Sequence, residues 1–78
     1  MKVTVLLFAS IAEVVGSRQL KLNVDNEATI DDLLDDLESS YPQMKKYRPV
    51  LLTALNDDYV DSTKRLTDGD QVAVFPPV

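Results

Sequence analysis

Alternation of apolar and polar positions defines the extended parts of this chain. Residues 2–9 carry apolar side chains at both parities, which is typical of a central strand with neither face fully wet. Residues 18–24 have one apolar and one polar face, and the same period of two returns just before Pro76 and Pro77. Prolines cannot donate ladder hydrogen bonds, so the last strand must end there. The pattern predicts five strands, at residues 2–9, 18–24, 50–56, 59–60 and 71–75.

The apolar period changes to that of a helix between the second and third predicted strands. Thr29 is a good N-cap residue, and the residue before Pro42 avoids the helical region of backbone conformation. We therefore expect an amphipathic helix over residues 30–39. Its apolar stripe follows the spacing i, i+3, i+4, i+7 and consists of Ile30, Leu33, Leu34 and Leu37.

Two connections have weaker signals. Ser10 and Glu13 fit a capping box with Ser10 as the N-cap, and Gly16 supplies a left-handed stop, so a short helical turn is expected between the first two strands. Residues 43–49 are expected to form an irregular connection.

The resulting order, strand–strand–helix–strand–strand–strand, is that of a ubiquitin-like β-grasp fold, which is an α+β architecture. We expect one domain over residues 1–78, with a mixed sheet of about five strands and one main helix across one face. Residues 76–78 are expected to be the start of a projecting C-terminal tail, stiff and extended at about 3.1 Å per residue. The expected helix-facing residues are Val3, Val5, Leu7, Val72 and Val74.

The opposite face of the sheet is the candidate for function. Leu6, Phe8, Ala73 and Phe75 should point away from the helix, and Phe8 and Phe75 should be neighbours because the first and last strands pair in this fold. A contiguous apolar patch on an open sheet face favours a docking surface. The alternative is that the segment 10–16 covers the patch.

Composition excludes several classes of function. The 78 residues carry a net charge of −5, which argues against a nucleic-acid partner. There is no cysteine and no histidine, and no apolar stretch is long enough to cross a membrane, so a soluble cytoplasmic protein is expected. A solvated helix face, rather than a metal site, is the interpretation of the carboxylates Asp31, Asp32, Asp35, Asp36 and Glu38. No catalytic constellation can be assembled, and the chain is not expected to be an enzyme by itself.

The end of the chain carries a family resemblance. The run from Val5 to Ala9, the turn Asp68-Gly69-Asp70, where glycine suits a positive φ, and the ending from Phe75 to Val78 resemble the small subunit of molybdopterin synthase. The resemblance covers essentially the whole chain. The aspartate–glycine–aspartate turn is shared with the thiamine-pathway sulfur carrier, whereas Phe-Pro-Pro-Val is more specific to the molybdopterin branch.

The resemblance implies a ubiquitin-like sulfur carrier that binds no cofactor or metal itself. In that family an ATP-using activating enzyme adenylates a C-terminal Gly-Gly, which becomes a thiocarboxylate and enters a pocket of the large synthase subunit, in an expected heterotetramer. By resemblance, the partner-binding residues are Leu6, Phe8, Phe75, Pro76, Pro77 and Val78.

The sequence given ends at Val78, so the reactive terminal glycine is expected beyond it and no catalytic residue is assigned within the chain. Two alternatives stay open. The chain is a sulfur carrier of another pathway, such as the thiamine type, or it is a β-grasp interaction module without sulfur chemistry.

Overall fold

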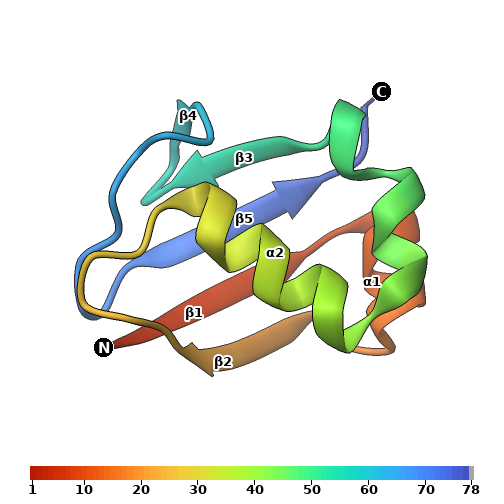
Figure 1. The fold of residues 1–78 in the computed structure, drawn as a ribbon. Helices are drawn as coiled ribbons and strands as arrows, with labels where there is room; N and C mark the ends of the chain where they lie inside the picture. Colours follow the sequence, from red (N-terminus) through yellow and green to blue (C-terminus); the bar gives the residue numbers. More distant parts are fainter. Residues whose placement is uncertain (78) are drawn as a thin grey trace.

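The computed structural model describes residues 1–77, and they form a mixed sheet with one long helix across one face (Figure 1). The strand order is β2-β1-β5-β3-β4, with β1 and β5 parallel and the other neighbouring pairs antiparallel. The β-grasp prediction is confirmed. The elements are β1 (Lys2–Leu7), α1 (Ala9–Val15), β2 (Gln19–Asn23), α2 (Ile30–Ser40), the 3-10 helices η1 (Pro42–Lys46) and η2 (Arg48–Val50), β3 (Leu52–Leu55), β4 (Asp58–Val60) and β5 (Gln71–Phe75).

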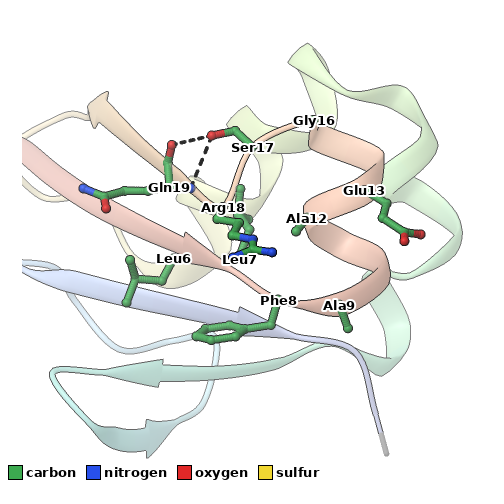
Figure 2. A pocket seen from close by; sticks show the side chains of 10 residues that line it. All are labelled: Leu6, Leu7, Phe8, Ala9, Ala12, Glu13, Gly16, Ser17, Arg18 and Gln19. Atoms are coloured by element: carbon green, nitrogen blue, oxygen red, sulfur yellow. Dashed lines mark hydrogen bonds between the residues drawn. The ribbon is translucent and has the colours of Figure 1, made fainter.

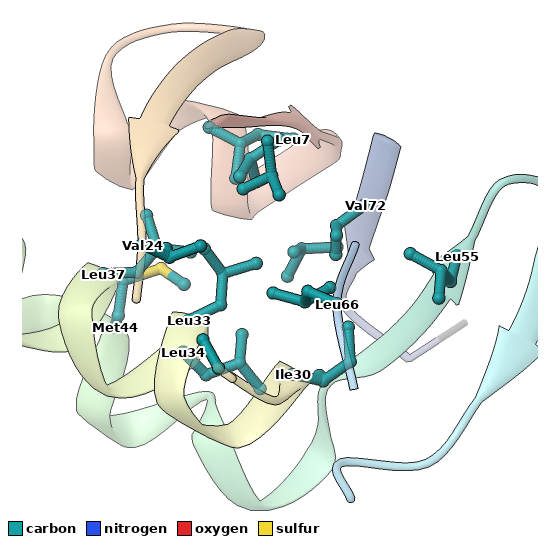
Figure 3. Packing of buried hydrophobic residues seen from close by; sticks show 14 of the residues in the cluster. Leu7, Val24, Ile30, Leu33, Leu34, Leu37, Met44, Leu55, Leu66 and Val72 are labelled. Atoms are coloured by element: carbon teal, nitrogen blue, oxygen red, sulfur yellow. The ribbon is translucent and has the colours of Figure 1, made fainter. Parts of the chain in front are cut away.

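The core lies between α2 and the inner face of the sheet (Figure 3). The apolar stripe of α2 is buried, as the helical period predicts. Every second side chain of the central strands β1 and β5 packs against this stripe. Among these side chains, Val5, Val72 and Val74 are fully inaccessible to solvent. The expected helix-facing set is therefore confirmed, and Leu66, from the loop before β5, completes the cluster.

Helix α2 begins where the sequence places it. The Thr29 backbone N–H donates to the Asp32 carboxylate at 2.9 Å, and the Asp32 N–H donates to the Thr29 hydroxyl at 3.3 Å. This reciprocal capping box satisfies two N-terminal donors that would otherwise lack partners. The helix ends at Ser40, one residue beyond the predicted range, and Tyr41 is its C-cap immediately before Pro42.

The predicted start of the short helix is wrong. Helix α1 begins at Ala9 with Phe8 as its N-cap, and no side chain caps it, so Ser10 lies inside the helix and makes no capping box with Glu13. The chain turns sharply at Ala9, whose φ of +51° lies in the left-handed region. That turn starts the helix two residues earlier than the capping pattern indicated. Gly16, with φ of +81°, ends the helix as expected.

The connection after α2 is more regular than predicted. Residues expected to be irregular form η1 and η2, and the third strand starts at Leu52 rather than at Val50. Pro49 explains the difference, because its fixed φ suits the first turn of a helix and it has no N–H to lose there. Met44 anchors the connection by burying its side chain in the core.

The acidic helix face is solvated, as predicted, and Arg48 adds ion pairs to it. Its guanidinium contacts three carboxylates of α2: Asp31 at 2.7 Å, Asp35 at 2.9 Å and Glu38 at 3.0 Å. Although partial burial acts to lower the pKa of Arg48, the hydrogen bonds that its guanidinium donates to these carboxylates raise the pKa above its ordinary value. One stripe of the solvated acidic face therefore carries ion pairs that tie the η1–η2 connection to α2.

The turn before β5 sets the register of the two parallel central strands. Gly69 has φ of +86°, as its position between two aspartates predicts, and its N–H donates to the Lys2 carbonyl at 2.8 Å. Asp68 accepts from the Lys2 N–H at 2.7 Å, and the Thr4 N–H donates to the Asp70 carbonyl at 2.9 Å. Both aspartates are thus structural, which confirms the sequence interpretation.

Candidate docking face and tail exit

The outer face of the sheet carries a row of side chains that crosses four strands. Leu6 of β1 pairs with Ala73 of β5, Ala73 pairs with Ala54 of β3, and Ala54 pairs with Tyr59 of β4. Residues paired in register share one face, so this row lies opposite α2. Its two central members are small, whereas both outer members are large.

A second row carries the aromatic cluster. Phe8, just past the end of β1, stacks on Phe75 of β5, with ring centroids 4.6 Å apart and planes 16° apart. Tyr59 approaches the same Phe75 ring at 6.2 Å and 46°. Leu52 pairs with Phe75 from the other side. The predicted proximity of Phe8 and Phe75 is confirmed.

These side chains are unusually exposed for their type. Phe8 and Leu52 are each 41% exposed and Tyr59 is 73% exposed, whereas Leu6 and Phe75 are half-buried. Because Ala73 and Ala54 are short, the large residues surround a hollow of about 190 Å³. The outer face therefore carries exposed apolar side chains around a central depression, which Asp57 and Gln71 also line.

Helix α1 does not cover this face. It directs Ile11 and Val15 into the core, and it stands at the end of the sheet (Figure 2). A groove of about 810 Å³ separates it from the outer surface of β1 and the start of β2, with Phe8 and Ala12 on its apolar walls and Arg18 at its rim. The alternative that residues 10–16 close the patch is wrong.

The tail leaves directly from the aromatic cluster. Strand β5 ends at Phe75, and Pro76 and Pro77 follow without regular secondary structure, Pro77 being exposed. The docking face and the exit of the tail are thus one continuous surface. Val78, the last predicted partner-binding residue, lies outside the described residues.

Sequence reasoning missed part of this surface. Leu52, Ala54 and Tyr59 belong to it, and none was assigned to a face from the pattern alone. Three of the four β3 residues are buried, so the strand shows no clear alternation, and only its register with β5 assigns its faces. The pattern also placed the start of β3 two residues too early.

Other chemistry is absent from the part of the chain that is described. No group of three or more His, Cys, Asp or Glu side chains within residues 1–77 is arranged to hold a metal ion. Over the same residues, none of the helices is long and apolar enough to cross a membrane.

A five-stranded mixed sheet crossed by one long helix, with exposed aromatic side chains on its other face, defines a ubiquitin-like β-grasp protein. The sequence matches the ThiS family over residues 5–78, and the chain belongs to that family.

Known relatives agree with the family assignment over the whole chain. The molybdopterin synthase sulfur carrier subunit of Chlamydomonas reinhardtii is 32% identical over 80 residues, covering 100% of this chain and 96% of the relative. The crystal structure of small archaeal modifier protein 1 from Haloferax volcanii superposes with a TM-score of 0.86 at 31% identity, covering 99% of this chain and 98% of that one. A complex of subunits 1 and 2 of the molybdopterin-converting factor from Helicobacter pylori contains a chain with a TM-score of 0.72 and 25% identity, covering 100% and 96%. The resemblance stated from the sequence is confirmed.

Proposed function

We propose that this chain is the sulfur-carrier subunit of a molybdopterin synthase and that it donates sulfur from its C-terminus without catalysing the reaction itself. The observation that carries the proposal is the continuity of Phe75 with Pro76 and Pro77, since one strand supplies both a ring of the docking face and the start of the tail. Full-length similarity to a subunit that bears this name supports it.

The outer face explains how such a subunit would bind its partner. Phe8, Phe75 and Leu6 form the surface that contacts the large synthase subunit, together with Tyr59 and Leu52. Exposed aromatic rings that become buried on association contribute strongly to binding, because they remove large apolar areas from water. The Helicobacter pylori complex supports a large-subunit partner, and we expect a heterotetramer.

The tail explains the transfer. Pro76 and Pro77 restrict the backbone to extended conformations, so the end of the chain is held away from the sheet. An ATP-dependent activating enzyme adenylates the carboxylate of a terminal glycine expected beyond Val78 and releases pyrophosphate. Sulfide-level sulfur from a separate sulfur donor then displaces AMP and leaves a thiocarboxylate. The large subunit then receives the sulfur for dithiolene formation.

Intact-mass measurement of the native protein, purified with its activating enzyme and ATP, tests the chemistry. We expect the mass of a chain in which one carboxylate oxygen is replaced by sulfur. The same experiment without ATP should give only the unmodified mass. An unmodified terminus in both samples would contradict sulfur carriage.

A second function is supported by a specific likeness. The small archaeal modifier protein of Haloferax volcanii has the same fold over nearly the full length of both chains. If this chain is a protein modifier, its C-terminus ends in an amide bond to lysine side chains of other proteins. Denaturing gels of the native host would then show the chain in covalent, higher-mass species that persist under reducing conditions. A thiocarboxylate carrier gives only the free chain.

A further inference from the structure

A second surface lies on the helix side of the sheet, along its free edge. Strand β2 is at one end of the strand order and spans five residues, with nothing paired on its outer side within residues 1–77 (Figure 1). The opposite edge strand, β4, has only three residues. Of the two edges, β2 is the longer row of backbone groups available for pairing.

The ladder to β1 determines which backbone groups of β2 face outward. The Val24 N–H donates to Met1 and the Leu7 N–H donates to Arg18, each at 2.9 Å. Since hydrogen-bonded positions alternate in an antiparallel pair, the N–H and C=O groups of Lys21 and Asn23 point away from β1. No hydrogen bond reaches these groups from another described residue.

The next outward position is already occupied. The Ser17 hydroxyl donates to the Gln19 carbonyl at 2.8 Å and accepts from the Gln19 N–H at 3.3 Å (Figure 2). The Ser17 side chain therefore satisfies the outward backbone groups at the start of this edge. The outward backbone groups without a partner are those of Lys21 and Asn23, within the described residues.

An apolar groove of about 350 Å³ runs beside the open edge, between β2 and the C-terminal half of α2. Leu20 and Leu22 of β2 and Tyr41 after α2 line it, and all three are only half-buried. A strand added to β2 would place every second side chain over this groove, because side chains alternate between the faces of a sheet.

The charge of the groove indicates what that strand carries. Asp36 of α2 lines the groove, and no ion pair forms at its carboxylate within the described chain. Arg48 forms ion pairs with Asp31, Asp35 and Glu38 of α2, but it does not contact Asp36. The Asp36 carboxylate is therefore an unpaired negative charge beside the groove, and it favours a cationic side chain there.

We propose that the edge of β2 and its groove bind an extended segment of a partner protein, with aliphatic residues at alternate positions and a lysine or arginine opposite Asp36. Main-chain hydrogen bonds to Lys21 and Asn23 supply the pairing, and the groove selects the side chains. This site is separate from the aromatic face, and it does not depend on sulfur carriage or on the C-terminus.

An NMR titration of the 15N-labelled full chain tests the proposal. The probe is the capped peptide acetyl-Val-Thr-Val-Thr-Arg-amide, whose valines and arginine share one strand face. We expect amide shifts at Lys21, Asn23 and Tyr41, and weaker binding of the same peptide ending in glutamate. The absence of shifts at millimolar peptide, or shifts confined to Phe8 and Phe75, would overturn the proposal.

Two matched pairs of variants locate the contacts. Lys21→Pro removes an outward N–H at an edge position where proline is tolerated, whereas Lys21→Thr removes the same side chain and keeps the donor. We expect Lys21→Pro to bind the peptide about three- to tenfold more weakly than Lys21→Thr, the loss expected for one hydrogen bond. Asp36→Asn should weaken binding about twofold or more, while Asp35→Asn should not. Equal affinities within both pairs would contradict strand addition at this edge.

Discussion

The two faces of the sheet come from the same strands but are made of different residues. On the inner face, Val5, Val72 and Val74 are completely buried under α2. On the outer face, Phe8 is 41% exposed and Tyr59 is 73% exposed. Aliphatic β-branched side chains fill a closed interior, whereas aromatic rings are exposed on the other side around two alanines.

The difference teaches that one strand can serve stability and association independently. Because side chains alternate, β5 gives Val72 and Val74 to the core and Ala73 and Phe75 to the outer face. A substitution of a core-facing residue of β5 should change the free energy of unfolding. A substitution of an outward-facing residue should change the affinity for a partner. The predictions below test that separation.

The largest expected effect is a loss of stability from a substitution in the core. Leu33→Ala removes a fully buried side chain from the middle of α2 and leaves a cavity, so the free energy of unfolding should fall by about 2–5 kcal/mol. Urea denaturation followed by circular dichroism measures it. Leu52→Ala, on the exposed outer face, is the matched control and should cost much less. A loss below about 1 kcal/mol for Leu33→Ala would place the stabilising contacts elsewhere.

The next largest expected effect is a loss of partner affinity from a substitution on the outer face of the sheet. Phe75→Ala removes the ring that contacts both Phe8 and Tyr59, so the dissociation constant for the large subunit should rise about tenfold or more. Calorimetric titration against the purified large subunit measures it. Lys2→Ala, at the far end of β1, is the control and should bind normally. Unchanged affinity with a several-kcal/mol loss of stability would show that Phe75 belongs to the core.

Local periodicity was sufficient to predict the layers of this fold. The stripe of α2, the two parities of β5 and the turn at Gly69 each depend on residues within a few positions of one another, and each was predicted correctly. The stacking of Phe8 on Phe75 followed from the strand order of the fold once the element order was known.

The rest depends on contacts that local patterns do not encode. Ala9 adopts a left-handed backbone conformation, which the residue type does not predict, and this conformation moves the start of α1. The pairing of β3 with β5, residues about 20 positions apart in the chain, decides which side chains of β3 face outward. Tyr59 could not be assigned to the aromatic cluster without that register.

Arg48 is the clearest case of a nonlocal contact, because its three carboxylate partners lie 10 to 17 positions earlier in the chain. It also provides the smallest predicted effect, since it belongs to neither face of the sheet. If α2 is held mainly by its buried stripe, then Arg48→Met should lower the free energy of unfolding by only about 1 kcal/mol. The partners Asp31 and Asp35 are more than half exposed, so water and salt screen these ion pairs.

Salt dependence separates the ion pairs of Arg48 from its packing. Urea denaturation at low and at 1 M salt should show the difference between wild type and Arg48→Met shrinking as salt rises, because screening weakens the pairs that the substitution removes. Arg48→Lys should recover part of the stability through a single point charge. Lys45→Met, on the same connection, is the matched control and should change stability little. If Arg48→Met lowered the free energy of unfolding as much as Leu33→Ala, α2 would depend on its charged side as much as on its buried stripe. Stability would then not come from the inner face of the sheet alone.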